Sequence, residues 1–251
     1  MVNIKLDELV RVENWAEAKR NSKGYSEIEL IVDLENQFCN DIEARLSDLS
    51  KKDRSKIESN RLTHLLIAWK FAIPESTPSV IADIGGGNGY FFDWIRRFTN
   101  TQNISWKIFE SPEICKAYSP HADILEILYY ENSIINISQE FDLAIVSGTL
   151  QYLKSYRKVL TALQQNSKYV LLMRIPFIDS EEDEIYVQSF SDGIYGKSNA
   201  SWPIRYFSRG AFIRKISESF EIVFSLEDSD ESFPWNSKQL PMTTILLKHK
   251  N

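Results

Sequence analysis

The most informative segment of the chain reads Val80-Ile-Ala-Asp-Ile-Gly-Gly-Gly-Asn-Gly-Tyr90. An apolar run leads into four glycines within five positions, and a helical pattern follows. Glycine lets the backbone take positive φ angles and approach a ligand closely, because no side chain stands in the way. The helix that follows presents unpaired N–H groups at its first turn. The segment therefore predicts a strand, a turn and a helix that bind a ligand at the turn.

An acidic residue at the end of the next predicted strand supports this interpretation. Glu110 ends the run Trp106-Lys-Ile-Phe-Glu110 and lies 25 residues after Gly85. In a doubly wound sheet, a carboxylate at this place meets a ribose and can accept hydrogen bonds from both ribose hydroxyls. Glu110 therefore suits either S-adenosylmethionine (SAM) or NAD as the cofactor.

The spacing of the glycines distinguishes these two cofactors. Dinucleotide binding uses Gly-x-Gly-x-x-Gly, but counting from Gly85 the third glycine position holds a tyrosine. Gly85, Gly87 and Gly89 instead form Gly-x-Gly-x-Gly after Asp83, the pattern of Rossmann-like SAM-binding domains. In those domains such an acid faces the amino acid end of SAM. We therefore expect SAM, bound by Asp83, the three glycines and Glu110.

The chain from about residue 75 alternates short β-rich runs with helical patterns, which predicts a doubly wound, mostly parallel α/β sheet. Seven runs are predicted as strands: Val80–Ile84, Ser105–Phe109, Ile127–Tyr130, Leu143–Ser147, Tyr169–Met173, Glu221–Leu226 and Thr243–Lys248. The helical patterns between them include Tyr90–Phe98, Tyr156–Asn166 and Arg209–Ser219, the last with Ser208 as its cap. Between the last two runs lies only an acidic and aromatic loop, 228–240, so we expect them to form a closing antiparallel hairpin.

Two regions are expected to flank the cofactor site. Residues 1–74 mix charge with apolar positions at helical spacing, which predicts three helices in an N-terminal extension. Trp15 and Tyr25 in this region either fold over the cofactor as a lid or anchor the helices. The SAM-binding domain is expected to cover 75–251, with an insertion at about 179–203 that caps the substrate site.

Composition and charge argue against several classes of protein. With 35 acidic and 29 basic residues the net charge is −6, which repels a phosphate backbone, so no nucleic-acid partner is expected. Only Cys39 and Cys115 are present, so neither a disulfide framework nor a metal site is indicated, and a cytoplasmic location fits best. No apolar run approaches the ~20 residues of a membrane span. A homodimer formed through the N-terminal helices stays open.

Further cofactor contacts are expected where the third and fourth predicted strands end. Asn132 follows the third strand and can read the adenine edge, although a polar turn explains it equally well. Ser147 and Gly148 follow the fourth strand, at the carboxyl edge where an open α/β sheet places its ligand crevice. We expect these two residues to contact the methionyl part of SAM.

Polar side chains near the same edge are candidates for the acceptor site. Tyr152 is expected to face the acceptor, and Arg174 ends the fifth strand, where its guanidinium can hold an acidic or hydroxyl-bearing group. A structural ion pair explains Arg174 equally well. Gln188, Trp202 and Tyr206 are expected to line an aromatic acceptor pocket or to pack within the cap. Methyl transfer needs chiefly alignment of acceptor and methyl group, which contributes roughly 7–11 kcal/mol, so a strong base is not always required.

Together these segments resemble a family of SAM-dependent methyltransferases often encoded among genes for surface polysaccharide biosynthesis. The resemblance spans most of the chain and rests on Asn14-Trp-Ala-Glu-Ala18, Ser22-Lys-Gly-Tyr25, Asp83-Ile-Gly-Gly-Gly-Asn-Gly-Tyr90, Ser147-Gly-Thr-Leu-Gln-Tyr152, Arg174-Ile-Pro-Phe177, Val187-Gln188 and Trp202-Pro203. It departs at Ile175, where the family usually has a small polar residue, and at Trp202, an aromatic residue directly before proline. It implies a class I, Rossmann-like methyltransferase that acts on oxygen or nitrogen of a small molecule, with a sugar or polysaccharide precursor as the suggested acceptor.

Two other functions stay open. A nicotinamide-dependent oxidoreductase would share the ribose-binding carboxylate, but the missing third glycine argues against it. A protein that binds SAM without catalysis fits the lack of an evident general base, since His64, His121 and His249 all lie outside the motifs.

Overall fold

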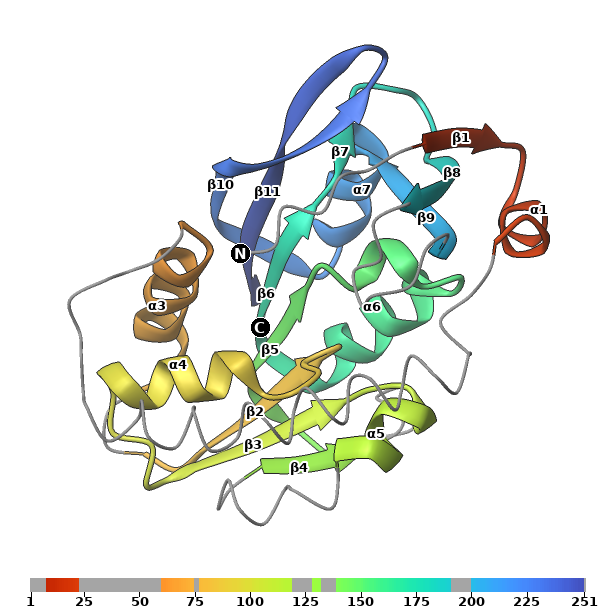
Figure 1. The fold of residues 1–251 in the computed structure, drawn as a ribbon. Coiled ribbons are helices and arrows are strands. Elements are labelled where there is room, and N and C mark those ends of the chain that lie inside the picture. The colour runs from red at the N-terminus through yellow and green to blue at the C-terminus, as the bar shows by residue number, and fades with distance from the viewer. Residues whose placement is uncertain are drawn as a thin grey trace.

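The centre of the molecule is a seven-stranded sheet with strand order β10-β11-β6-β5-β2-β3-β4 (Figure 1). The structure is a computed structural model that describes residues 8–22, 60–74, 77–118, 128–131, 139–190 and 200–250. The parallel strands are β2 (Ser79–Ile84), β3 (Ile104–Phe109), β4 (Leu128–Glu131), β5 (Phe141–Ser147) and β6 (Ser167–Ile175). β10 (Phe220–Trp235) and β11 (Lys238–His249) form an antiparallel hairpin, and β11 pairs antiparallel with β6. The predicted doubly wound sheet and its closing hairpin are confirmed.

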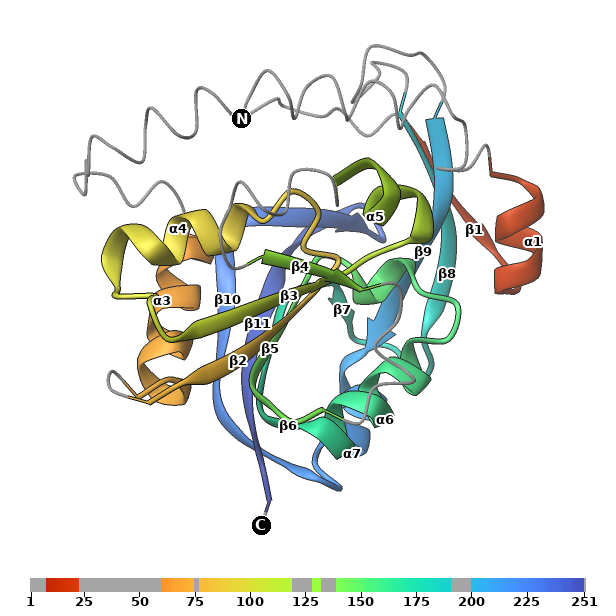
Figure 2. The same cartoon turned by 90° about the horizontal axis from the view of Figure 1, so that it is seen from below.

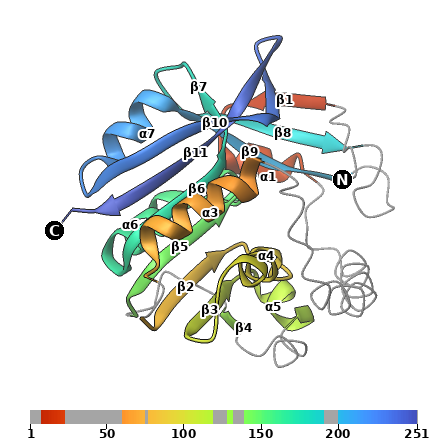
Figure 3. The ribbon, with the colours of Figure 1, turned by 90° about the vertical axis from the view of Figure 1, so that its left-hand side faces the viewer.

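Helices cover both faces of this sheet, as the alternating pattern of a parallel α/β fold requires. One face carries α3 (Asn60–Ala72), α4 (Tyr90–Phe98) and α5 (Pro112–Tyr118), and the other carries α6 (Tyr156–Asn166) and α7 (Arg209–Ile216) (Figures 2 and 3). Successive side chains of a strand point to opposite faces, so Leu143 and Ile145 pack toward α3 and α4 while Ala144 and Val146 pack toward α6. The predicted helices 90–98 and 156–166 are confirmed, and α7 begins at the expected Ser208 cap, whose hydroxyl accepts from the backbone N–H of Ala211 at 3.3 Å.

A second sheet has four strands in the order β1-β8-β9-β7 and includes most of the predicted cap segment; we call it the cap, and its role in covering a substrate site stays a prediction. Its strands are β1 (Glu8–Val12), β8 (Glu184–Phe190), β9 (Ala200–Ser208) and β7 (Phe177–Ile178). Tyr206 and Ile178 of this sheet pack against Phe233 and Met242 of the hairpin β10–β11. Figure 1 shows the hairpin reaching past the central sheet to lie beside β7, so one hairpin belongs to both parts of the fold.

Two local expectations are wrong. The N-terminal region is predicted to be helical, but residues 8–12 form β1 and pair with 185–189 of β8, because their β-branched residues suit the free edge of that strand. The loop predicted at 228–240 is largely strand, since β10 continues to Trp235 and β11 begins at Lys238. The turn between them is Asn236 and Ser237, whose φ angles of 47° and 63° match a tight two-residue hairpin.

The described part of the N-terminal region is anchored to the cap. Trp15, at the start of α1 (Trp15–Arg20), lies 5.2 Å from the guanidinium of Arg205 on β9. That guanidinium also stacks at 4.6 Å on the ring of Tyr156 and pairs with Asp183 at 3.3 Å. These contacts favour the anchoring interpretation of Trp15, while Tyr25 lies outside the described residues. No helix within the described ranges is long and apolar enough to cross a membrane.

Candidate functional site

The glycine turn joins β2 to α4 at the carboxyl edge of the central sheet. Gly85, Gly87 and Gly89 have φ angles of 72°, 52° and 78°, which residues with a side chain rarely adopt. A Cβ atom on Gly85 would lie 2.0 Å from Oγ1 of Thr149, so this glycine is needed for packing against the end of β5. Around Gly87, in contrast, no atom of the described residues outside the turn lies within 4 Å of where Cβ would be. The turn is therefore tightly packed at one glycine and open at another.

Asp83 lies directly beneath this turn. A Cβ atom on Gly86 would lie 2.5 Å from Cγ of Asp83, and the indole Nε1 of Trp106 donates to Oδ2 of Asp83 at 3.3 Å. Burial raises the pKa of Asp83 to about 7, the hydrogen bond from Trp106 lowers it, and the charge of Glu110 raises it. The carboxyl group of Asp83 therefore changes between its protonated and its ionised form near neutral pH. A cation that approaches the turn favours the ionised form.

Glu110 immediately follows β3 and reaches the same turn. Its Oε1 accepts from the backbone N–H of Gly87 at 3.1 Å, and its Oε2 accepts from the backbone N–H of Ser111 at 3.1 Å. Burial raises the pKa of Glu110, while these two backbone hydrogen bonds lower it. The structure thus brings together the glycine turn and the carboxylate that the sequence predicts as its partner.

The end of β5 lies between the glycine turn and β6. Gly148 has a φ angle of 62° and donates its backbone N–H to the carbonyl of Met173 at 3.0 Å. The hydroxyl of Thr149, which packs on the glycine turn, donates to the carbonyl of Ser147 at 3.1 Å. Ser147 and Gly148 are therefore beside the turn, as expected of cofactor contacts. Asn132 lies outside the described residues.

Arg174 is a non-glycine residue with a positive φ angle, 58°, at the carboxyl end of β6. Its Nε donates to Oε2 of Glu231 at 2.5 Å, and its Nη1 lies 2.7 Å from where a Cβ atom on Gly148 would be. Arg61 of α3 approaches the same Glu231 carboxylate at 3.7 Å. Arg174 therefore makes the ion pair considered in the sequence analysis, but it makes that pair beside the predicted cofactor site.

The remaining acceptor candidates divide into two groups. Gln188 of β8 donates its amide Nε2 to the hydroxyl of Tyr152 at 3.1 Å, so the structure brings these two together. Tyr152 lies in the 3-10 helix η2 (Leu150–Tyr152) and is 37% exposed. Trp202 and Tyr206 are buried, and the Tyr206 ring packs 4.8 Å from that of Tyr186, which agrees with packing inside the cap.

Sequence reasoning missed Glu231, the partner of Arg174, and Arg61, which approaches the same carboxylate. Arg61 lies in α3 and Glu231 in β10, so they come from opposite ends of the chain. Glu231 belongs to the segment predicted as an acidic loop. The run of acids near residue 230 was the available signal, but only the strand pairing shows which of them meets an arginine.

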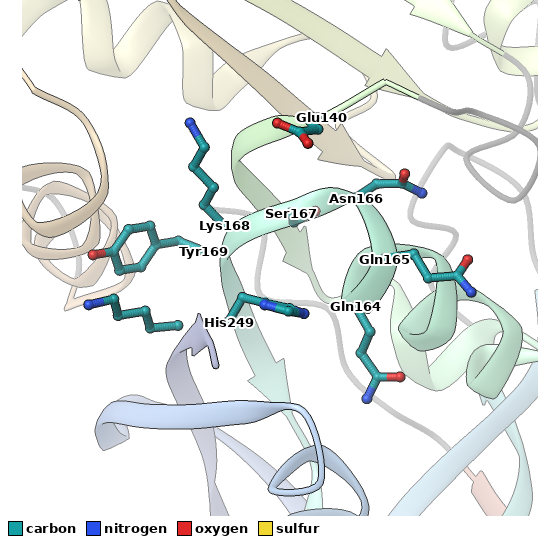
Figure 4. A pocket seen from close by; sticks show the side chains of 9 residues that line it. Glu140, Gln164, Gln165, Asn166, Ser167, Lys168, Tyr169 and His249 are labelled. Carbon is teal, nitrogen blue, oxygen red and sulfur yellow. The ribbon is translucent and has the colours of Figure 1, made fainter. Parts of the chain in front are cut away.

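A separate surface hollow of about 360 Å³ lies away from this site (Figure 4). It is lined by Glu140, Gln164, Gln165, Asn166, Ser167, Lys168, Tyr169, Lys248 and His249. These residues lie before β5, at the end of α6, at the start of β6 and at the end of β11, which is the opposite edge of the sheet from the glycine turn. Among the described residues, no group of three or more His, Cys, Asp and Glu side chains is arranged to hold a metal ion.

Comparison with known proteins identifies the fold. No protein-family model and no curated protein sequence matches the chain. The structure resembles that of an S-adenosylmethionine-dependent methyltransferase from Clostridium acetobutylicum, with a TM-score of 0.54 and 13% identity over 85% of this chain and 100% of that one. It also resembles SAM-bound CalS10, an amino pentose methyltransferase from Micromonospora echinaspora, with a TM-score of 0.52 and 11% identity over 82% of this chain and 97% of that one. The chain therefore has the α/β fold of class I methyltransferases, with a mostly parallel seven-stranded sheet.

Proposed function

We propose that this protein is a SAM-dependent methyltransferase that acts on an oxygen or nitrogen atom of a small molecule. The observation that carries the proposal is the contact of Glu110 with the backbone N–H of Gly87, above the buried Asp83. A carboxylate, an unobstructed glycine backbone and a second acid meet here at the carboxyl ends of parallel strands, where this fold class binds ligands. The shared fold with SAM-dependent methyltransferases supports the same cofactor.

The residues present fit SAM. Glu110 can accept hydrogen bonds from ribose hydroxyls, and the open space at Gly87 lets a ligand approach the backbone. Asp83, once ionised, can attract the α-ammonium group, and we propose that Ser147 and Gly148, beside the turn, contact the methionyl chain. Bound SAM supplies an electrophilic methyl group on a sulfonium. The adenine contact that we predict for Asn132 stays a prediction.

The acceptor side is proposed to involve Arg174, Tyr152 and Gln188. The amide of Gln188 donates to the hydroxyl of the partly exposed Tyr152, which fixes the orientation of this phenol. Arg174 and Tyr152 would orient the acceptor, since alignment rather than strong base catalysis is the main requirement of this reaction. A sugar or polysaccharide precursor is favoured by the family resemblance, and CalS10 acts on an amino pentose.

The test is a calorimetric titration of the protein with SAM, its demethylated product S-adenosylhomocysteine (SAH), and NAD. We expect saturable binding of SAM and SAH and none of NAD. Glu110→Gln should weaken SAM binding by about 10–100-fold, because hydrogen bonds to a charged group contribute about 1.5–3 kcal/mol. Glu218→Gln is the matched control, since Glu218 is a surface acid paired only with Lys215 at 2.6 Å in the described contacts. Binding of NAD alone, or of no adenosyl ligand, would refute the proposal.

If SAM binds but no acceptor pool is methylated, the non-catalytic alternative gains support. A screen of radiolabelled SAM against pooled sugars, sugar phosphates and amines distinguishes the two cases. Transfer of label to any small molecule, lost in Glu110→Gln and retained in Glu218→Gln, would establish the enzyme.

A further inference from the structure

Three irregularities of the backbone meet at the carboxyl end of β6. Arg174 has a left-handed φ angle of 58°, the pairing of β11 with β6 shifts between Thr243 and Ile245, and the pairing of β10 with β11 shifts between Asp228 and Ser232. Thr243 pairs with Ile175, the residue after Arg174, so the first two irregularities are adjacent. Bulges re-aim side chains, and unfavourable φ angles persist at functional sites where the surroundings hold them in place.

Together these irregularities bring Arg174 and Glu231 into contact as an ion pair. The shift in β10 leaves residues 229–231 outside the regular ladder, and Glu231 from this bulge accepts from Nε of Arg174 at 2.5 Å. Nη1 of Arg174 then lies over Gly148, 2.7 Å from where a side chain there would begin. The arginine is thus held by one nitrogen and extends its other end across the turn that follows β5.

Among the side chains that the structure describes, the charges around Glu231 are unequal. Arg61 contributes a second guanidinium, whose Nη1 lies 3.7 Å from Oε1 of Glu231 and whose Cζ lies 5.8 Å above the ring of Phe91. Phe91 is in the first turn of α4, directly after the glycine turn. Two guanidinium groups therefore share one carboxylate at the rim of the site. All three side chains are partly buried, where charges are screened less than in bulk water.

We propose that Arg174, with Arg61 behind it, binds an anionic group, a carboxylate or a phosphate, on the methyl acceptor. The inference rests on the proposed function, because it places the acceptor beside SAM. The proposed cofactor residues lie on β2, after β3 and after β5, whereas Arg174 lies on β6, on the other side of β5. From Arg174 the chain passes directly into β7 of the cap, so this arginine is on the acceptor side. A guanidinium fork matches the paired oxygens of both anions.

The experiment measures binding of three probes to the SAH-loaded protein by calorimetry: glucuronate, glucose 6-phosphate and glucose. We expect at least one anionic probe to bind at least tenfold more tightly than glucose, and the comparison of the two anions identifies carboxylate or phosphate as the preferred group. Arg174→Asn should weaken the binding of that anionic probe at least tenfold. It should change the dissociation constant of SAH by less than twofold. Asparagine is chosen because it tolerates positive φ angles, so the variant should fold.

Arg209→Asn is the matched control, since Arg209, the first residue of α7, makes an exposed ion pair at 3.3 Å with Glu227 of the same hairpin. It should leave the binding of all three probes unchanged. Three results would overturn the proposal. The protein could bind glucose as tightly as the anions, it could bind neither anion, or Arg174→Asn could leave anion binding unchanged. A loss of SAH binding in Arg174→Asn would also overturn it, because the arginine would then serve the cofactor.

Failure of the proposed function gives a different result. If the unmodified protein binds no SAH, the methyltransferase proposal is refuted, whether or not the protein binds the anionic probes. Repeating the titrations without SAH then shows whether Arg174 binds anions independently of any cofactor, in which case the ligand is not a methyl acceptor.

Discussion

Glu110 accepts a hydrogen bond from the backbone N–H of Gly87 at 3.1 Å, which holds a carboxylate against a glycine with open space where its side chain would be. The same turn is closed at Gly85, where Thr149 fills the space of a side chain. Neighbouring glycines of one motif therefore have different tasks, one in packing and one facing open space. Substituting each of these glycines by alanine distinguishes the packing role from the binding role.

Gly87→Ala should impair SAM binding more than stability. The new methyl group meets no atom of the described residues outside the turn, so the expected cost to folding is that of the left-handed backbone, about 1–2 kcal/mol. Gly85→Ala should cost more, by about 1–3 kcal/mol, because its methyl group overlaps Thr149. Urea unfolding and SAM titration of both variants measure this. Thr149→Ala should partly restore the stability of Gly85→Ala, and equal destabilisation by the two alanines would contradict the assignment.

Stability should decline with rising pH because of Asp83. Burial raises its pKa to about 7 in the folded chain, from 3.8 in the absence of burial. The folded chain then holds a proton that the unfolded chain has lost between these two values, so the free energy of unfolding is highest below this window and falls as pH rises through it. The decline is on the order of 3 kcal/mol. Asp83→Asn should flatten it, which urea unfolding at pH 4.5 and pH 8 tests, and an unchanged slope would exclude Asp83 as the cause.

SAM affinity should change with pH in the opposite direction. Ionised Asp83 attracts an ammonium group, so the affinity is expected to rise as pH passes through about 7. The hydrogen bond from Trp106 lowers the pKa of Asp83, so Trp106→Phe should move the midpoint of this rise to higher pH. Calorimetric titrations at several pH values give the midpoint. If Trp106→Phe leaves the pH midpoint of SAM binding unchanged, ionisation of Asp83 is not the cause of the pH dependence.

Tyr152 and Gln188 should be energetically coupled. Tyr152→Phe removes the acceptor of a buried amide donor, at a cost of about 1–2 kcal/mol, since an unpaired buried polar group keeps its full desolvation penalty. Gln188→Met removes the donor as well, so the double variant should lose less than the sum of the two single variants. A double-mutant cycle in urea measures the coupling. Additive losses would show that the hydrogen bond contributes nothing to stability.

Trp15 should stabilise the cap without serving the cofactor. Its ring lies 5.2 Å from the guanidinium of Arg205, which also contacts Tyr156 and Asp183. Trp15→Ala should cost about 1 kcal/mol through the lost cation–π contact and expose α1 to limited proteolysis. SAM binding should be unchanged. Weaker SAM binding at full stability would instead favour the lid interpretation of this residue.

Most of the central sheet can be predicted from local patterns. The strands β2, β5 and β6 each contain a continuous apolar stretch because helices cover both faces of the sheet. The glycine turn and Glu110 are also local signals, since each directly follows a strand. Parallel pairing of β2 with β3 then brings them to one edge without any further information.

The cap and the ion pair at Arg174 depend on pairing between distant parts of the chain. β1 is a run of five residues whose partner, β8, lies far along the sequence, and its apolar positions fit a helix equally well. Glu231 reaches Arg174 only because the register of β10 shifts between Asp228 and Ser232. Neither a distant partner nor a register shift has a sequence signal of its own, which is why Arg61 and Glu231 went unrecognised.

The position of β11 has a consequence for biosynthesis. This strand, residues 238–249, comes after both β6 and β10 in the chain, yet it lies between them inside the sheet. Until the ribosome has released it, β6 has an unpaired edge and β10 has no neighbour in the sheet, a state that is prone to aggregation. The contact of Glu231 with Arg174 needs β10 in place. The proposed acceptor side is therefore completed only after β10 and β11 have been made, and a nascent chain that has already formed its glycine turn would still lack it.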